Sequence, residues 1–132
     1  MAFVHGKDTY ISIDGDDLSA YCDTSEIERA SDEDDVTTYG RDDHVVAGGL
    51  LKGSVSAGGT YDDTSAGPAA VLNPLVGTVV TLIRRPEGTG TGKPQESMSV
   101  LIKSVKETNP VAGHIKWSFD GTRSGAITDT TQ

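Results

Sequence analysis

Apolar and polar residues alternate one by one in several short segments of this chain. Residues 114–120 place Ile115, Trp117 and Phe119 on one side and polar residues on the other. Residues 50–61 alternate in the same way, with small polar residues on the second side. Successive side chains of a strand point to opposite faces, so this pattern favours β-strands that are buried on one face.

The same analysis extends to most of the chain. Six segments are predicted as strands: Thr9–Asp14, Leu18–Ala30, Leu50–Tyr61, Thr78–Arg85, Ser97–Glu107 and His114–Asp120. The second of them is also compatible with a helix capped at Ser25. The alternation of Glu26, Ile27 and Glu28 favours the strand. The 16 glycines and the low aromatic content of 5% suit short strands and tight turns.

One short helix is predicted between the third and fourth strands. Residues 62–65 can cap it, Pro68 fits its first turn, and the apolar stripe of residues 69–76 ends at Gly77. Pro74 limits its regular part. The element order predicts a mainly β protein: an antiparallel β-sandwich or barrel with one flanking short α-helix and a long loop between the second and third strands.

The length of 132 residues indicates a single domain, residues 1–132. Residues 31–49 form a long polar segment with little periodicity, which we predict to be a loop used in assembly. The polar C-terminal tail, residues 121–132, is expected to be loose unless a neighbour orders it.

Charge is distributed unevenly along the chain. Residues 1–66 hold fifteen acidic and four basic residues, whereas residues 67–132 hold five and seven. A subunit that packs one face onto a different face of its neighbour can use this polarity, because complementary potentials select the partner and its register. The pI near 4.5 argues against sequence-independent binding of nucleic acid, which needs a basic surface.

No pattern indicates an active site, a cofactor or a metal. The segment Gly88–Lys93 lacks the spacing of a phosphate-binding loop, and the acidic clusters lack the spacing of a calcium-binding EF-hand. The three histidines are scattered, and Cys22 is the only cysteine. No apolar run approaches the length of a membrane span, and residues 1–6 do not resemble a signal peptide, so we expect a chain made in the cytosol without a membrane anchor.

Several segments in order resemble the major tail tube proteins of long-tailed bacteriophages. The stretches that carry the resemblance are Ser12–Ser19, Asp35–Gly40, Gly49-Leu50, Tyr61–Asp63, Gly67–Leu75 and the strand into Arg85–Gly88. This resemblance implies six copies in a ring, with rings stacked head to tail into the tube that carries genome DNA. It implies a structural virion protein that is not an enzyme, assembled in the host bacterial cytoplasm and located in the virion tail. Its partners would be other copies and tail proteins such as the tape measure and the tail terminator, and DNA would pass without specific binding.

The resemblance also assigns roles to residues. The loop at 31–49 would reach an adjacent subunit or ring, and the basic residues near 84–93 would receive it. The predicted interface residues are Asp34, Asp35, Val36, Thr37, Thr38, Tyr39, Arg84 and Arg85. The predicted lumen-facing residues are Glu26, Glu28, Ser54 and Ser56, with Lys52 on the same surface.

Three other classes of protein fit the same pattern. The first is another small virion part, such as a tail terminator, a head-completion protein or a decoration protein. The second is the tube subunit of a contractile injection machine. The third is a β-sandwich that binds Ca²⁺ or carbohydrate, and an enzyme is a more distant alternative.

Overall fold

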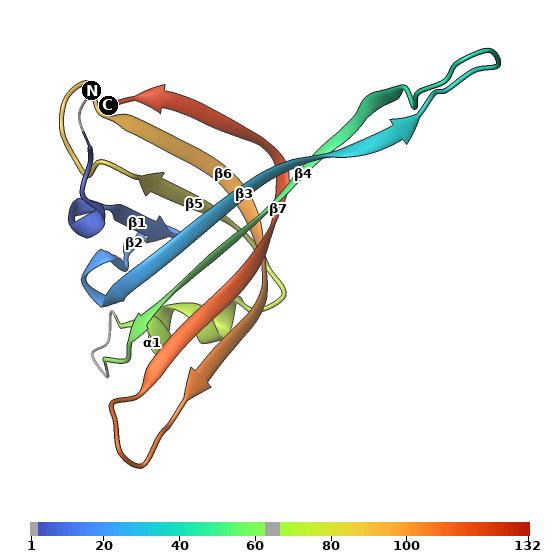
Figure 1. The fold of residues 1–132 in the computed structure, drawn as a ribbon. Helices are drawn as coiled ribbons and strands as arrows, with labels where there is room; N and C mark the ends of the chain where they lie inside the picture. The colour runs from blue at the N-terminus through green and yellow to red at the C-terminus, as the bar shows by residue number, and fades with distance from the viewer. Residues whose placement is uncertain (1–2, 63–66) are drawn as a thin grey trace.

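A computed structural model of the chain describes residues 3–62 and 67–132. These residues form a seven-stranded antiparallel sheet in the order β2-β1-β5-β6-β7-β4-β3. The strands are β1 (Tyr10–Ile13), β2 (Asp16–Asp17), β3 (Cys22–Asp35), β4 (Val46–Thr60), β5 (Val79–Arg85), β6 (Pro94–Thr108) and β7 (Lys116–Thr131). The sheet is strongly curved (Figure 1), and the predicted fold class, mainly β and antiparallel with one short helix, is confirmed.

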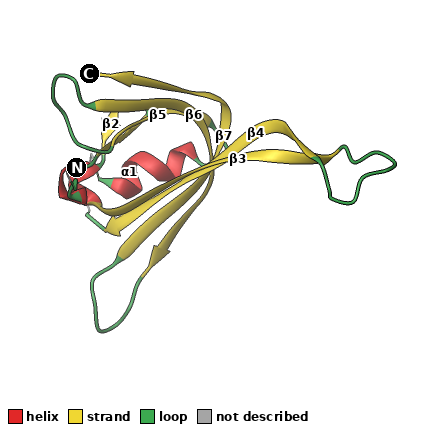
Figure 2. Ribbon diagram, turned by 45° about the horizontal axis from the view of Figure 1, so that its top comes forward, coloured by secondary structure: helices red, strands yellow, loops and turns green. Residues whose placement is uncertain are grey.

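The short helix α1 (Pro68–Leu72) continues into a 3-10 turn, Asn73–Leu75, and lies inside the curve of the sheet (Figure 2). Pro68 occupies the first turn as predicted, and Gly77 follows with a φ of 86°. Of the cap predicted at residues 62–65, residues 63–65 lie outside the described residues, and the N-cap position of α1 is instead occupied by Gly67. Two further 3-10 turns, Gly6–Asp8 and Ser19–Tyr21, precede β1 and β3.

The hydrophobic core lies on the same side of the sheet as α1. Its buried members are Ile11, Ile13, Leu18, Val55, Ala57, Leu72, Leu82, Met98, Val100, Ile102, Trp117 and Phe119. The Trp117 and Phe119 rings stack with centroids 6.5 Å apart. The Trp117 indole donates to the carbonyls of Tyr21 and Thr60, at 3.2 and 3.1 Å, so its polar atom is satisfied within the core.

The strand predicted at residues 18–30 is confirmed from Cys22 onward, whereas residues 19–21 form a 3-10 turn, and the helical alternative is wrong. Strand β3 pairs with β4 from Cys22↔Gly59 to Asp35↔Val46, which gives a long β-hairpin. Strand β4 pairs with β7 only from Ser54↔Thr122 to Thr60↔Lys116. The remaining part of the hairpin therefore leaves the sheet and projects away from the molecule (Figure 1).

The structure corrects two predictions, the long loop at residues 31–49 and the loose tail at residues 121–132. The loop predicted at 31–49 is shorter, because residues 31–35 and 46–49 are strand and only residues 36–45 connect them. The tail predicted at 121–132 is instead part of β7, which pairs with β6 as far as Thr131↔Pro94. Gln132 is also held, because its side-chain amide donates to the Gly88 carbonyl at 2.8 Å. Residues 31–35 are polar on both faces, and residues 46–49 and 121–132 show no regular alternation of apolar and polar residues, so the pattern that reveals a strand is missing.

Candidate subunit interface

The projecting hairpin, which we call the arm, comprises residues 30–52. Every residue from 32 to 52 is exposed. Half of the large apolar side chains that are exposed in the described part of the chain belong to the arm: Val36, Tyr39, Val45, Val46, Leu50 and Leu51. Tyr39, at the tip, is as exposed as an isolated residue, at 105%. Apolar side chains concentrated on one exposed element mark an interaction surface.

The tip of the arm is organised by hydrogen bonds although it has no core. The Val36 amide donates to the Val45 carbonyl at 2.9 Å, and the Val45 amide donates to the Thr37 hydroxyl at 2.8 Å. The Thr37 hydroxyl and amide both donate to the Asp35 carboxylate. These two hydrogen bonds, and to a smaller extent the hydrogen bond from His44, lower the Asp35 pKa. The tip therefore presents its side chains in a defined arrangement.

The arm is also strongly acidic. It contains six acidic residues and two basic ones, Arg41 and Lys52. Lys52 forms an ion pair with Asp32 at 2.8 Å. By strand alternation it shares a face of β4 with Ser54 and Ser56, and its place on a lumen surface stays a prediction. The predicted interface residues 34–39 all lie on the arm, and their role in assembly stays a prediction.

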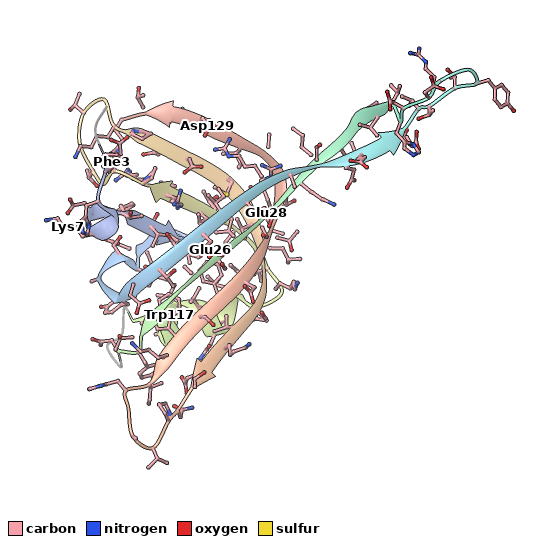
Figure 3. The ribbon with its side chains drawn as sticks, viewed as in Figure 1. Phe3, Lys7, Glu26, Glu28, Trp117 and Asp129 are labelled. Carbon is pink, nitrogen blue, oxygen red and sulfur yellow. The ribbon has the colours of Figure 1, made fainter. Side chains whose placement is uncertain are left out.

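The four residues predicted to face a lumen share one face of the sheet. Glu26 is directly opposite Ser56, and Glu28 is directly opposite Ser54. Figure 3 shows the two glutamates along β3. The intervening Ile27 pairs with the buried Val55, so the glutamates and serines lie on the face away from the core. Their role in lining a lumen stays a prediction.

Asp120 of β7 extends this polar face. It is paired with Ser56, and the next pair on this face toward the arm is Ser54↔Thr122. Neither glutamate nor Asp120 forms an ion pair with a described residue. The alternation in the sequence places Asp120 on the polar side of its strand. That this side continues the polar face of β3 and β4 follows only from the pairing of β7 with β4.

Arg84 and Arg85, which were predicted to face a neighbouring subunit, have partners within the chain. Arg84 donates to Glu96 at 2.8 Å, and its side chain is only 17% exposed. Arg85 donates to the Gln95 side chain at 2.9 Å, and its guanidinium carbon lies 4.5 Å from the centre of the Tyr10 ring. Both side chains are therefore engaged within the subunit, and their role in a contact with another copy stays a prediction.

Glu96 is the centre of an ion-pair network at the base of the arm. Arg29 donates to Glu96 at 2.7 Å and to both oxygens of Asp129 at 2.7 and 3.0 Å. The hydrogen bond to Asp129, followed by that to Glu96, raises the Arg29 pKa. The hydrogen bond from Arg29 in turn lowers the Asp129 pKa. The network joins β3, β5, β6 and β7, which sequence analysis could not bring together because its residues are far apart in the chain.

Neither a low-pKa cysteine nor a metal-binding cluster is found among the described residues. Burial, followed by Asp23 and Asp17, raises the pKa of the Cys22 thiol to about 12, so the thiol is protonated at neutral pH. No group of three His, Cys, Asp or Glu side chains in residues 3–62 and 67–132 is arranged to hold a metal. Over the same residues, no helix has the length and apolar content needed to cross a membrane.

Solved structures provide the comparison that relates this fold to known assemblies. A chain from the virion of a native gene transfer agent particle superposes with a TM-score of 0.80 at 18% identity, covering 98% of this chain and 100% of that one. A chain from the tail of an empty gene transfer agent particle with C6 symmetry gives 0.79 at 19% identity over the same shares. The SPP1 tail tube gives 0.74 at 12% identity, covering 98% and 80%.

The chain has the fold of these tail proteins. At identities below 20%, the likeness concerns the fold, and it extends over nearly the whole chain, with the arm included. No protein-family model matches the sequence, and no curated protein matches it.

Proposed function

We propose that this chain is the structural subunit of a phage-type tail tube. Copies form rings, most simply of six, and the rings stack into a tube through which genome DNA passes. The full-length likeness to tail structures, one of them from a particle tail with C6 symmetry, supports this proposal. The role is mechanical and not enzymatic.

The arm is the single observation that carries the proposal. A two-stranded hairpin in isolation is at best marginally stable in water, and this one also exposes six large apolar side chains. Another copy of the chain can cover them. A contact between two different faces of identical subunits continues from copy to copy, as a stacked tube requires.

The polar face of the sheet supports the proposed lumen. Glu26, Glu28 and Asp120 carry negative charge there, and none of them forms an ion pair with a described residue. A duplex with one negative charge for about every 1.7 Å of its axis is repelled by such a surface. DNA can then slide through without binding.

Location and partners follow from this role. The protein belongs to the virion tail and is assembled in the cytoplasm of the bacterial host. The two ends of the tube would contact other tail proteins, such as a tail terminator, and the bore would enclose a tape measure protein before DNA enters.

Electron microscopy of the purified protein tests the proposal. We expect rings and tubes of uniform bore at high concentration. As a matched control, replacing residues 34–47 by Asn-Gly shortens the arm to a tight turn and should leave a folded subunit that does not form tubes. Wild-type protein that stays monomeric at high concentration would contradict the function, and single rings that never stack would favour a terminator or head-completion protein.

A further inference from the structure

The sheet divides at the base of the arm. Strands β4 and β7 are paired from Thr60↔Lys116 to Ser54↔Thr122. Beyond this point, among the described strands, residues 46–53 of β4 pair only with β3. Residues 123–131 of β7 pair only with β6. Two strand edges thus diverge from a common point (Figure 1). We call the space between them the fork. Unpaired strand edges are ready to accept another chain.

The fork contains a hollow of about 330 Å³. Its principal lining residues are Arg29, Ala30, Leu51, Arg123, Ala126 and Ile127. Leu51 is 76% exposed although it belongs to the side of β4 that carries the core residue Val55 lower down. The apolar side of the sheet therefore continues beyond the core into the fork, where its side chains are exposed.

Arg123 gives the fork an available positive charge. It forms no ion pair with any described residue, in contrast to Arg29, which is engaged by Glu96 and Asp129. A Cβ atom on Gly53 would lie 3.6 Å from the Arg123 guanidinium carbon and only 2.3 Å from the Glu28 carbonyl oxygen. The glycine is thus required by the close approach of β3, and the Arg123 guanidinium lies beside it at the side of the hollow.

These features fit a segment that presents apolar side chains beside carboxylates. The tip of the arm has this composition, because Val36 and Tyr39 are flanked by Asp34 and Asp35 on one strand and by Asp42 and Asp43 on the return. An arm cannot enter its own fork. It forms one wall of that fork and extends away from it, and residues 46–53 alone span about 26 Å at 3.3 Å per residue.

We propose that the fork of one copy receives the arm tip of the next copy. Tyr39 and its apolar neighbours occupy the hollow beside Leu51 and Ile127, and an acidic residue of the tip pairs with Arg123. The contact is heterologous, so each copy donates one arm and receives another, and the series does not close within a pair. This inference rests on the proposed function and assigns the receiving surface, which lies at residues 123–127 and not at Arg84.

Cysteine crosslinking tests the fork directly. Tyr39→Cys combined with Ala126→Cys should give a ladder of covalent multimers under mild oxidation, because a disulfide requires Cα atoms within about 7 Å. Cys22 can stay, since its buried thiol is protonated at neutral pH. The control is Tyr39→Cys with Val111→Cys, because Val111 is 108% exposed and lies in the β6–β7 turn at the opposite end from the arm (Figure 1). Equal crosslinking by the two pairs would overturn the proposal.

A charge reversal at Arg123 provides the second part of the test. In the Tyr39→Cys, Ala126→Cys background, Arg123→Glu should lower the crosslinked fraction at least about tenfold, which is the ratio that 1.4 kcal/mol produces. Arg123→Lys should largely retain it, and an unchanged yield with Arg123→Glu would exclude the assigned charge contact. Tubes that form without the 39–126 crosslink would overturn the fork and leave the tube function intact. A 39–126 ladder from protein that forms no tube would support the fork and contradict the tube.

Discussion

The body of the sheet and the arm contrast in how they hold their shape. In the body, twelve apolar side chains are buried, Trp117 and Phe119 among them, and the strands between the two edges of the sheet pair on both sides. In the arm, strand pairing and a few hydrogen bonds at the tip maintain the shape, while the side chains are exposed. The body is therefore packed within one chain, whereas the arm exposes apolar side chains that another copy would cover under the proposed function. Substitutions should separate these two kinds of stability.

The largest effect is expected in the core of the body. Phe119→Ala removes a ring that is 1% exposed and stacked on Trp117, so the free energy of unfolding should fall by about 3–5 kcal/mol. Denaturant unfolding followed by circular dichroism measures this loss. Leu50→Ala on the arm is the matched control and should cost less than about 0.5 kcal/mol in the monomer. Equal losses would show that the arm is packed within the single chain.

The ion-pair network at the base of the arm should have an intermediate effect. Glu96→Ala leaves Arg84 without its carboxylate partner in a mostly buried position, and we expect a loss of about 2 kcal/mol, between the values typical of exposed and of buried pairs. Glu107 lies on the same strand but is exposed and forms no ion pair with a described residue. Glu107→Ala should therefore leave the free energy of unfolding nearly unchanged. Similar values for the two variants would contradict a structural role for the network.

The same network predicts a pH dependence. The hydrogen bond from Arg29 lowers the Asp129 pKa, so the stabilisation is fully present above the ordinary aspartate pKa near 4 and is lost as pH falls through the lowered value. Wild-type protein should therefore lose more stability between pH 5 and pH 3 than Asp129→Asn. Thermal unfolding across this range measures the difference, and parallel curves would exclude the contribution of Asp129.

Substitutions on the arm should affect assembly and leave the body unchanged. Asp34→Lys with Asp35→Lys should alter the free energy of unfolding of the body by less than about 0.5 kcal/mol, because both side chains are exposed and the hydrogen bonds that Asp35 accepts lie within the arm tip, and should abolish polymerisation. Sedimentation velocity measures the loss. Asp16→Lys with Glu107→Lys makes the same change in charge at exposed sites outside the arm and should leave assembly intact. Normal assembly of the arm variant would remove the acidic residues from the interface.

The smallest effect on fold and assembly is expected on the polar face. Glu26→Lys with Glu28→Lys places cations opposite the small Ser56 and Ser54, where there is no steric conflict, so tubes should still form. Those tubes should bind duplex DNA at low salt, whereas wild-type tubes should not. A filter-binding assay with purified tubes distinguishes the two, and a variant that gains no affinity for DNA would contradict the lumen assignment.

Sequence analysis succeeded where burial leaves an alternating pattern. The alternation around Trp117 and Phe119 identified both a strand and its buried side, because only one face of that strand meets water. Residues 31–35 of the arm were missed as strand because both of their faces are exposed. The fork and the ion-pair network were also missed, since Arg29, Arg123 and Asp129 meet only through the curvature and pairing of the sheet. The sequence supplied the acidic character of the arm but not the surface that could receive it.

The position of the only tryptophan has a practical consequence. Trp117 lies at the lower end of β7, far from the arm (Figure 3), and both its ring and its indole N–H are engaged inside the body. Its fluorescence should therefore shift when the body unfolds and stay constant when an arm docks. A single natural chromophore thus reports the folding of each subunit without interference from polymerisation, while light scattering in the same cuvette follows growth of the tube.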